Sequence, residues 1–312
     1  MLAYAARRVL GLIPVLFTAV VLCFIAIQLV PGDPIMVLLS DQSGDPELEA
    51  RLRADYGLDR PLIVQFVDYL AGVLRGDFGM SFRFANLPVS EVIGTSLAIS
   101  PILALSALAI ALSLGLVLGT FAALRRNTAA DTAVIVVLVA GISIPNFAMA
   151  AFLVYLFAIR LKVLPVAGWG SPEQVILPVL VLAIPPMAYI ARLTRTYMLE
   201  VLQQDYIRTA RAKGLRERIV IWRHALRNTL VPLLTTVGII FGGLLSGTFV
   251  VETIFNIPGL GRLAIEAIFA RDYPVTMAIV LLFTLFYAGI NLLIDLLYGL
   301  IDPRIRLGGE GS

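Results

Sequence analysis

The chain has 312 residues, of which 59% are hydrophobic and 14% charged, whereas about 25% of the residues of a soluble domain are charged. A protein core cannot bury this much apolar surface, so lipid must cover part of it. The net charge is only +3, and we expect no nucleic-acid partner. A single cysteine, Cys23, excludes a disulfide framework, and a single histidine, His224, excludes multi-histidine metal sites, so we expect no metal or cofactor site.

Six apolar segments are long enough to cross a bilayer, which takes roughly 20 residues. They cover residues 9–30, 96–124, 132–159, 175–191, 230–251 and 275–301. The first follows a basic pair, as in a signal peptide, but it is too long and lacks a small-residue cleavage site. We therefore predict an all-α integral membrane protein with six transmembrane helices, the first of which stays in place as an anchor.

Lysine and arginine gather on one side of the predicted spans. Basic residues precede the first span at 7–8, follow the second at 125–126 and the sixth at 304 and 306, and nine lie between residues 192 and 227. The opposite side carries residues 31–95, with ten acids and five arginines. Because cytoplasmic loops are enriched in Lys and Arg, we expect both termini in the cytoplasm.

Residues 31–95 are predicted to form a small extracytoplasmic cap between the first two spans. Residues 46–56 indicate a short helix that stops at Gly57, and residues 62–74 carry an apolar stripe at helical spacing before the break at 76–79. The alternative is a plain surface loop.

Several spans contain residues that interrupt or loosen a helix. In the third span Pro145 frees a backbone carbonyl, and Ser143 and Asn146 can satisfy freed groups or face water. In the fifth span Gly242 and Gly243 allow close helix approach. Such residues are tolerated in membranes beside other helices or a water-filled cavity, so we predict that these five residues line a translocation path. Helix packing without a pore is the alternative.

A basic polar segment, residues 205–215, stands between the fourth and fifth spans. Apolar residues from Leu199 to Ala210 form one helical stripe, Gly214 is placed to end the helix, and a second short helix is predicted at 217–226. This pattern predicts a helix-turn-helix that protrudes from the membrane. It could lie on anionic lipid, but Thr209 and Ala210 are small, which favours a closely fitting protein partner.

This segment resembles the coupling loop, or EAA loop, of bacterial ABC importer permeases, in which three residues separate Glu-Ala-Ala from a following Gly. Arg208, Thr209 and Ala210 occupy the Glu-Ala-Ala positions, with Gly214 after them. The arginine in place of the acid and the long interval to Pro232 depart from the general pattern. Both departures resemble the peptide and nickel subfamily, whose loops read DYxRTARAKG and then RHxLRN, as residues 205–214 and 223–228 do here.

Further motifs are similar to the B-type member of the permease pair in dipeptide, oligopeptide and nickel importers. They stand at residues 30–34, 56–62, 76–81, 251–261, 272–274 and 301–306. The resemblance implies a type I ABC importer permease fold in a bacterial inner membrane. It divides the chain into a first helix plus cap (1–95), a permease core (96–302, with the coupling loop at about 199–228) and a cytoplasmic tail (303–312).

The resemblance also implies partners and site residues. Expected partners are a second homologous permease chain, two cytoplasmic ATPase subunits that bind ATP and Mg, and an extracytoplasmic substrate-binding protein. The chain has no G-x-x-x-x-G-K-[ST] phosphate loop, so it is not the ATPase and is not expected to be an enzyme. The expected coupling residues are Asp205, Arg208, Thr209, Ala210, Arg211, Lys213 and Gly214, and the expected outer-gate residues are Glu252, Asn256 and Asp272.

Small peptides are the expected cargo, and glutathione or nickel in the same architecture is the alternative. An intramembrane enzyme belongs to a different class. It would need a histidine at membrane depth, whereas His224 is predicted in the cytoplasmic loop, and the chain has no H-E-x-x-H motif. A channel without ATPases would leave the protruding basic loop unexplained.

Overall fold

The structure is a computed structural model that describes residues 2–30, 32–33, 35, 46–84 and 87–301. Over these residues the named elements are all helices, beside an isolated bridge between Met80 and Pro88. Five described helices are long and apolar enough to cross a membrane, and the number rises to six if one bent pair is a single span. The predicted all-α membrane fold is confirmed, although the third span differs in shape.

The chain forms two compact units that interleave along the sequence. Of the described residues, the core unit holds those within 101–257 and 289–301, and the cap unit holds those within 2–100 and 258–288. The expected division at residue 95 stays a prediction, and the predicted tail at 303–312 lies outside the described residues, as do the basic residues at 304 and 306.

In the core unit, α9 (Pro172–Leu202) packs against α7 (Ala129–Ser143) and α12 (Leu226–Ile254). The helix α6 (Ile99–Leu124) also packs against α9. Glycines on α6 permit close packing against α9, since a Cβ atom at Gly119 would lie 2.3 Å from the carbonyl oxygen of Ala191. The helix α9 runs unbroken through Pro185 and Pro186 to Leu202, and is therefore longer than the predicted span of 175–191.

The third span is broken instead of continuous. The helix α7 ends at Ser143, α8 (Asn146–Leu153) begins after Pro145 and continues into the π-helical segment η1 (Val154–Arg160), and the two parts are bent by 107°. Proline disfavours the helical conformation of the residue before it, and Ile144 is extended with ψ of 120°. The sequence indicated an interruption at Pro145 but not its size.

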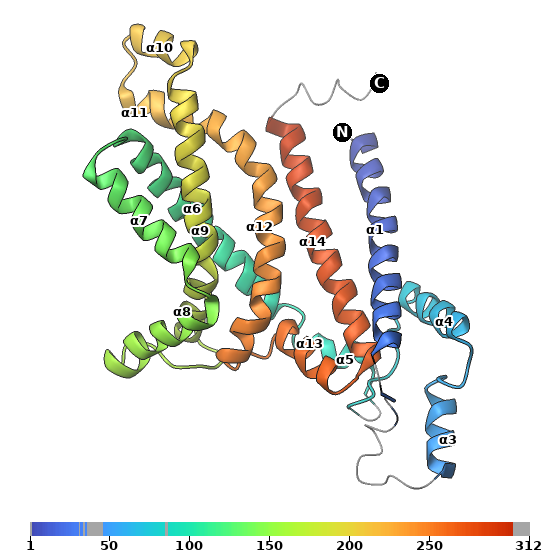
Figure 1. The fold of residues 1–312 in the computed structure, drawn as a ribbon. Coiled ribbons are helices and arrows are strands. Elements are labelled where there is room, and N and C mark those ends of the chain that lie inside the picture. The colour runs from blue at the N-terminus through green and yellow to red at the C-terminus, as the bar shows by residue number, and fades with distance from the viewer. Residues whose placement is uncertain (1, 31, 34, 36–45, 85–86, 302–312) are drawn as a thin grey trace. The chain divides into compact units, whose positions relative to one another are not determined.

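The polar segment forms the helix α10 (Asp205–Ala212), and Gly214 follows with φ of +75°. The second predicted helix is divided into α11 (Glu217–Ile219) and the π-helical η2 (Val220–Ala225), which runs directly into α12. As a result Pro232 lies inside α12 and not in its first turn. Within the core unit, α10 and α8 lie at opposite ends of α9 (Figure 1).

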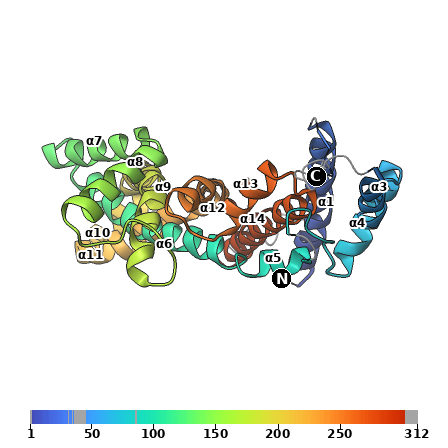
Figure 2. The same ribbon diagram turned by 90° about the horizontal axis from the view of Figure 1, so that it is seen from below.

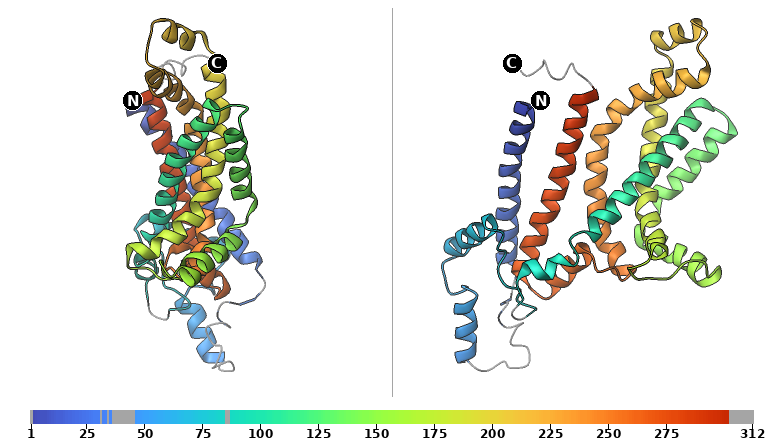
Figure 3. Two further views of the ribbon diagram at one scale, coloured as in Figure 1. Left: turned by 90° about the vertical axis from the view of Figure 1, so that its left-hand side faces the viewer. Right: turned by 180° about the vertical axis from the view of Figure 1, so that it is seen from behind.

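The cap unit contains α1 (Leu2–Leu29), α3 (Pro46–Asp55), α4 (Leu62–Leu74), α5 (Val89–Gly94), α13 (Leu260–Phe269) and the first part of α14 (Tyr273–Ile301). The helices α3 and α4 were predicted and lie on the same side of α1 (Figures 2 and 3). The helices α5 and α13 were not predicted, and they share an apolar cluster with α14 around Ile93, Leu260 and Ile279. Two of the ten acids counted in residues 31–95, Asp41 and Asp45, lie outside the described residues.

Candidate functional site

The helix α10, predicted from the sequence to couple to an ATPase, is attached to the core unit by its apolar face. Ile207 is fully buried and Ala210 is 7% exposed, and both belong to one cluster with Ala123 of α6, Met198 of α9 and Val220 of η2. An eight-residue helix is too short to be stable in isolation. Its position is therefore set by its packing on α6, α9 and η2.

The opposite face of α10 is exposed and carries the predicted coupling residues. The Arg208 side chain is 76% exposed and lies 3.5 Å from the Asp205 carboxylate. The exposed Thr209 satisfies its hydroxyl locally by donating to the carbonyl of Asp205 at 3.0 Å. Ala210 packs inward in the cluster, as the predicted apolar stripe indicates, and not on the outer face where its small size suggested a partner contact; its part in coupling stays a prediction.

The turn after α10 is held by its backbone conformation and by one ion pair. Gly214 has φ of +75°, and no atom lies within 4 Å of the position that a Cβ would take, so conformation and not crowding favours glycine there. The Arg211 guanidinium donates twice to the Glu217 carboxylate, at 2.7 and 3.2 Å. This contact lowers the pKa of Glu217 and raises the pKa of Arg211.

Two of the five predicted path residues meet in a hollow of about 280 Å³ within the core unit. Its lining includes Asn146 of α8, Pro185, Pro186 and Tyr189 of α9, and Gly243 and Gly247 of α12. The two prolines have no N–H to donate, so the carbonyls of α9 one turn earlier lose their helical partners. The hollow thus combines apolar walls with an amide and a phenol group.

The other three predicted path residues are placed differently. Ser143 is exposed and donates its hydroxyl to the carbonyl of Val139 at 2.8 Å, which satisfies it within α7. Pro145 is exposed at the break, and Gly242 is half-buried beside Gly243. The structure therefore brings together Asn146 and Gly243, and the path itself stays a prediction.

The predicted outer-gate residues are buried or strained. Glu252, in the core unit, is fully buried, and Asn256 follows α12 with φ of +53°. Asp272, in the cap unit, is 1% exposed, and its carboxylate accepts hydrogen bonds from the Ser81 hydroxyl and, at 3.1 Å, from the Arg83 N–H. Asp272 thus holds the 81–84 segment of the cap in place. This contact connects the sequence motif at 76–81 with the motif at 272–274.

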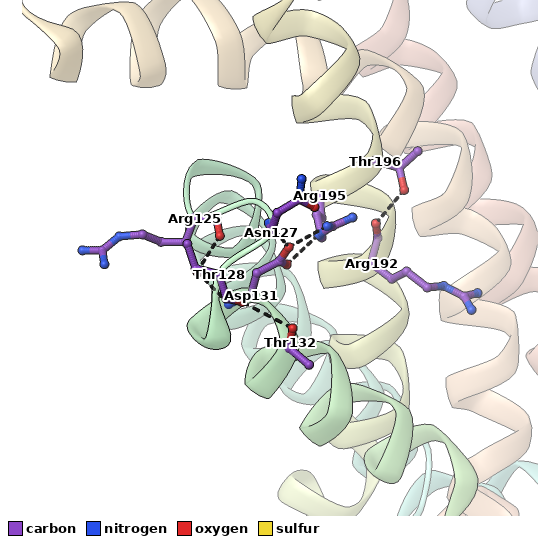
Figure 4. A network of polar contacts seen from close by, with 8 residues as sticks. All are labelled: Arg125, Asn127, Thr128, Asp131, Thr132, Arg192, Arg195 and Thr196. Atoms are coloured by element: carbon purple, nitrogen blue, oxygen red, sulfur yellow. Dashed lines mark hydrogen bonds and ion pairs between the residues drawn. The ribbon is translucent and has the colours of Figure 1, made fainter.

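Sequence reasoning missed a buried ion pair between α7 and α9. The Arg195 guanidinium donates to both carboxylate oxygens of Asp131, at 2.8 and 2.7 Å, and the Asp131 side chain is 4% exposed (Figure 4). Arg195 was counted only as a basic residue after the fourth span, although it lies inside α9. A signal was present in Thr128, which caps α7 three residues before Asp131.

In the described part of the chain, the His, Cys, Asp and Glu side chains form no group of three or more that could hold a metal ion. Cys23 is half-buried in the cap unit among Phe24, Phe66 and Tyr69.

Comparisons with known proteins agree over nearly the whole chain. The family described as binding-protein-dependent transport system inner membrane component matches residues 115–307, and the N-terminal family of the same systems matches residues 1–100. The dipeptide transport system permease protein DppB of Bacillus subtilis (strain 168) is 42% identical over 100% of both chains. The glutathione transport system permease protein GsiC of Salmonella choleraesuis (strain SC-B67) is 43% identical over 98% of this chain and 99% of the relative.

Solved structures share the fold. An inward-facing structure of the MetNI methionine ABC transporter aligns with a TM-score of 0.58 at 15% identity, covering 68% of this chain and 96% of the other. An amino acid ABC transporter crystallised with histidines aligns with a TM-score of 0.51 at 18% identity, covering 67% and 94%. The chain therefore belongs to the family of inner membrane components of binding-protein-dependent transport systems, and it is a multi-pass permease subunit of an ABC importer.

Proposed function

We propose that this permease imports small peptides, as one of two homologous membrane-spanning chains that work with two cytoplasmic ATPase subunits. ATP and Mg bind to those ATPases, and an extracytoplasmic binding protein delivers the cargo. The B. subtilis relative, named a dipeptide permease and matched over the full length of both chains, supports this cargo. The placement of Lys and Arg supports cytoplasmic termini.

The observation that carries the proposal is the construction of α10. Its apolar side is buried in the core unit while Arg208 and Arg211 are left at the surface, with Gly214 closing the turn. Because α10 is packed on the core unit and exposes basic residues, an ATPase that binds these residues could displace α10 and the core unit together. Rigid-body movement of such an element can switch a cavity between two sides of a membrane.

Charge reversal at Arg208 tests the docking of α10. Arg208 is the cleaner position because a glutamate at 211 would face Glu217, across the ion pair that closes the turn. We expect Arg208→Glu to weaken ATPase association and peptide uptake while the chain still inserts. The matched control is Arg125→Glu, an exposed arginine that follows α6 and lies outside the predicted coupling loop at 199–228. Normal association and uptake in Arg208→Glu would count against docking at α10.

Thiol labelling tests the path. In a Cys23→Ala background, cysteines at Asn146 and Gly243 should react with a water-soluble thiol reagent, and their reactivity should differ between nucleotide-free and ATP-trapped complexes. Gly119→Cys is unsuitable as a control because a Cβ there would meet α9 at 2.3 Å. Leu138→Cys serves better, since Leu138 is 5% exposed and packs on α9. Inert thiols at 146 and 243 in both states would place the path elsewhere.

The outer cap is proposed to contact the binding protein together with the loop at 255–273, and Glu252, Asn256 and Asp272 are proposed as part of the outer gate. Two of its acids are already paired in the structure: the exposed Glu47 with Arg51 at 3.2 Å and the half-buried Glu49 with Arg53 at 2.8 Å. Replacing only the acids would therefore leave two arginines without these partners. Neutralising Glu47 and Glu49 should slow association at low salt more than neutralising both members of each pair.

Glutathione is the second candidate cargo, since the Salmonella relative is named a glutathione permease and is 43% identical. Uptake by the complete importer decides between the candidates. Competition of a labelled dipeptide by unlabelled dipeptide, glutathione and nickel ion, each in excess, should show displacement by the dipeptide. Displacement by glutathione or nickel alone would replace the peptide assignment.

A further inference from the structure

We propose that Asp131 and Arg195 are positioning residues that make α7 move together with α9 and the coupling helix α10. The inference rests on the proposed function, because it concerns how a displacement of α10 by an ATPase reaches the hollow. Neither residue belongs to the motifs that identify the coupling loop.

The pair joins three elements at one point. The Asp131 carboxylate accepts both bonds from Arg195 of α9, and it also accepts the N–H of Asn127 at 3.0 Å, from the turn between α6 and α7 (Figure 4). Asp131 is held in turn by the cap of α7, where its own N–H donates to the Thr128 hydroxyl at 3.4 Å. A guanidinium fork on a carboxylate fixes both distance and orientation, which a lysine would not do.

The rest of the contact between α7 and α9 is apolar and lacks such directionality. Leu138 and Val134 of α7 pack against Ala188 and Ala191 of α9. Near the far end of α7, a Cβ at Gly141 would lie 3.1 Å from Ile184. Contacts of this kind hold two helices together but do not by themselves fix how far one has moved along the other, because the hydrophobic effect is non-directional. The ion pair supplies that register.

The helices on either side of the pair lead to the two functional regions. Arg195 lies three residues before Met198, which packs directly in the cluster that holds Ile207 of α10. At its other end α7 stops at the Pro145 break, and Asn146, immediately beyond, lines the hollow. Pro185, Pro186 and Tyr189 of α9 form one wall of the hollow and move with α9 in any case. With the pair intact, α7 is carried along as well, so the wall formed by Asn146 moves together with the wall formed by α9.

The experiment compares the coupling of transport to hydrolysis. The complete importer, with its ATPases and binding protein, is reconstituted in vesicles, and a labelled dipeptide is the probe. Asp131→Asn keeps the size of the side chain but removes its charge. Arg192→Gln is the matched control: it removes a cation from α9 one turn away, where the structure shows a contact with the Tyr189 ring (5.5 Å) and no ion pair with a described acid.

We expect Asp131→Asn to retain ATPase association and hydrolysis, while the amount of dipeptide imported per ATP falls by roughly five-fold or more. Arg192→Gln should keep the wild-type ratio. An unchanged ratio in Asp131→Asn, with only a lower melting temperature, would show that the pair is a brace and would overturn the inference. A wild-type complex that hydrolyses ATP without import would overturn the proposed function, and the inference with it.

A second variant covers the case in which Asp131→Asn fails to fold. In a Cys23→Ala background, Asp131→Cys and Arg195→Cys are combined and bridged by a bifunctional thiol reagent. We expect the bridged complex to regain import per ATP relative to the unbridged one, because a covalent tether restores the register without charge. Failure of the bridge to restore the ratio in folded complex would refute the positioning role.

Discussion

Truncation of Ile207 should loosen the helix α10 from the rest of the chain. The side chain is fully buried among Ala123, Met198 and Val220. An isoleucine-to-alanine change at such a site costs about 2–5 kcal/mol, and isoleucine to valine about 0.5–1.5 kcal/mol. Because α10 has eight residues and cannot persist alone, most of this loss should appear as local opening of α10.

Hydrogen exchange measures that opening directly. A loss of about 2 kcal/mol corresponds to roughly thirty-fold faster exchange of the α10 amides. Ile207→Val should give a smaller increase, and Leu215→Ala, at a side chain 38% exposed, should give little. We further expect Ile207→Ala to lower import per ATP, since a loose helix does not transmit displacement. Unaltered exchange and coupling in Ile207→Ala would refute the view that this cluster holds α10.

Three further outcomes are expected. Gly214→Ala should cost about 1–2 kcal/mol through its left-handed conformation, and Gly214→Asn less, as measured by thermal unfolding; equal costs would contradict this. Asp272→Asn or Ser81→Ala should cost about 1.5–3 kcal/mol and speed tryptic cleavage in the 81–84 segment; unchanged cleavage would show that the ion pair of Arg83 with Glu266, at 2.9 Å, holds the segment without Asp272. Glu217→Gln should cost less than about 1 kcal/mol, because its pair with Arg211 is half-exposed. Since the pKa of Glu217 is lowered, this contribution is complete above about pH 4.3 and is lost as the pH falls further; a loss near neutral pH would argue otherwise.

The elements that the sequence predicted well are those with a strong local signal. Residues 62–74 carry a helical apolar stripe and form α4 with those bounds, and Gly57 and Gly214 take the positive φ expected after a helix. The predicted apolar stripe between Leu199 and Ala210 contains both residues that α10 buries, Ile207 and Ala210. These features depend on residues a few positions apart, so a single sequence is sufficient to show them.

The features that escaped prediction depend on residues far apart in the chain. Asp131 and Arg195 are separated by 64 positions, and Ser81 and Asp272 by 191. Each looks like an ordinary polar residue until its partner is known. The bend at Pro145 was indicated but not its angle, because the angle depends on where α8 packs.

The division of labour on α10 has a consequence for how such importers diversify. The residues that fasten the helix, Ile207 and Ala210, are separate from those at its surface, Arg208, Thr209 and Arg211. Mutations on the surface can therefore accumulate, or be exchanged between permeases, without loosening the anchor. Under the proposed docking of an ATPase on α10, compatibility with a given ATPase would be set separately from the fold, and exchanging these three side chains would be a small graft with which to direct a permease to another ATPase.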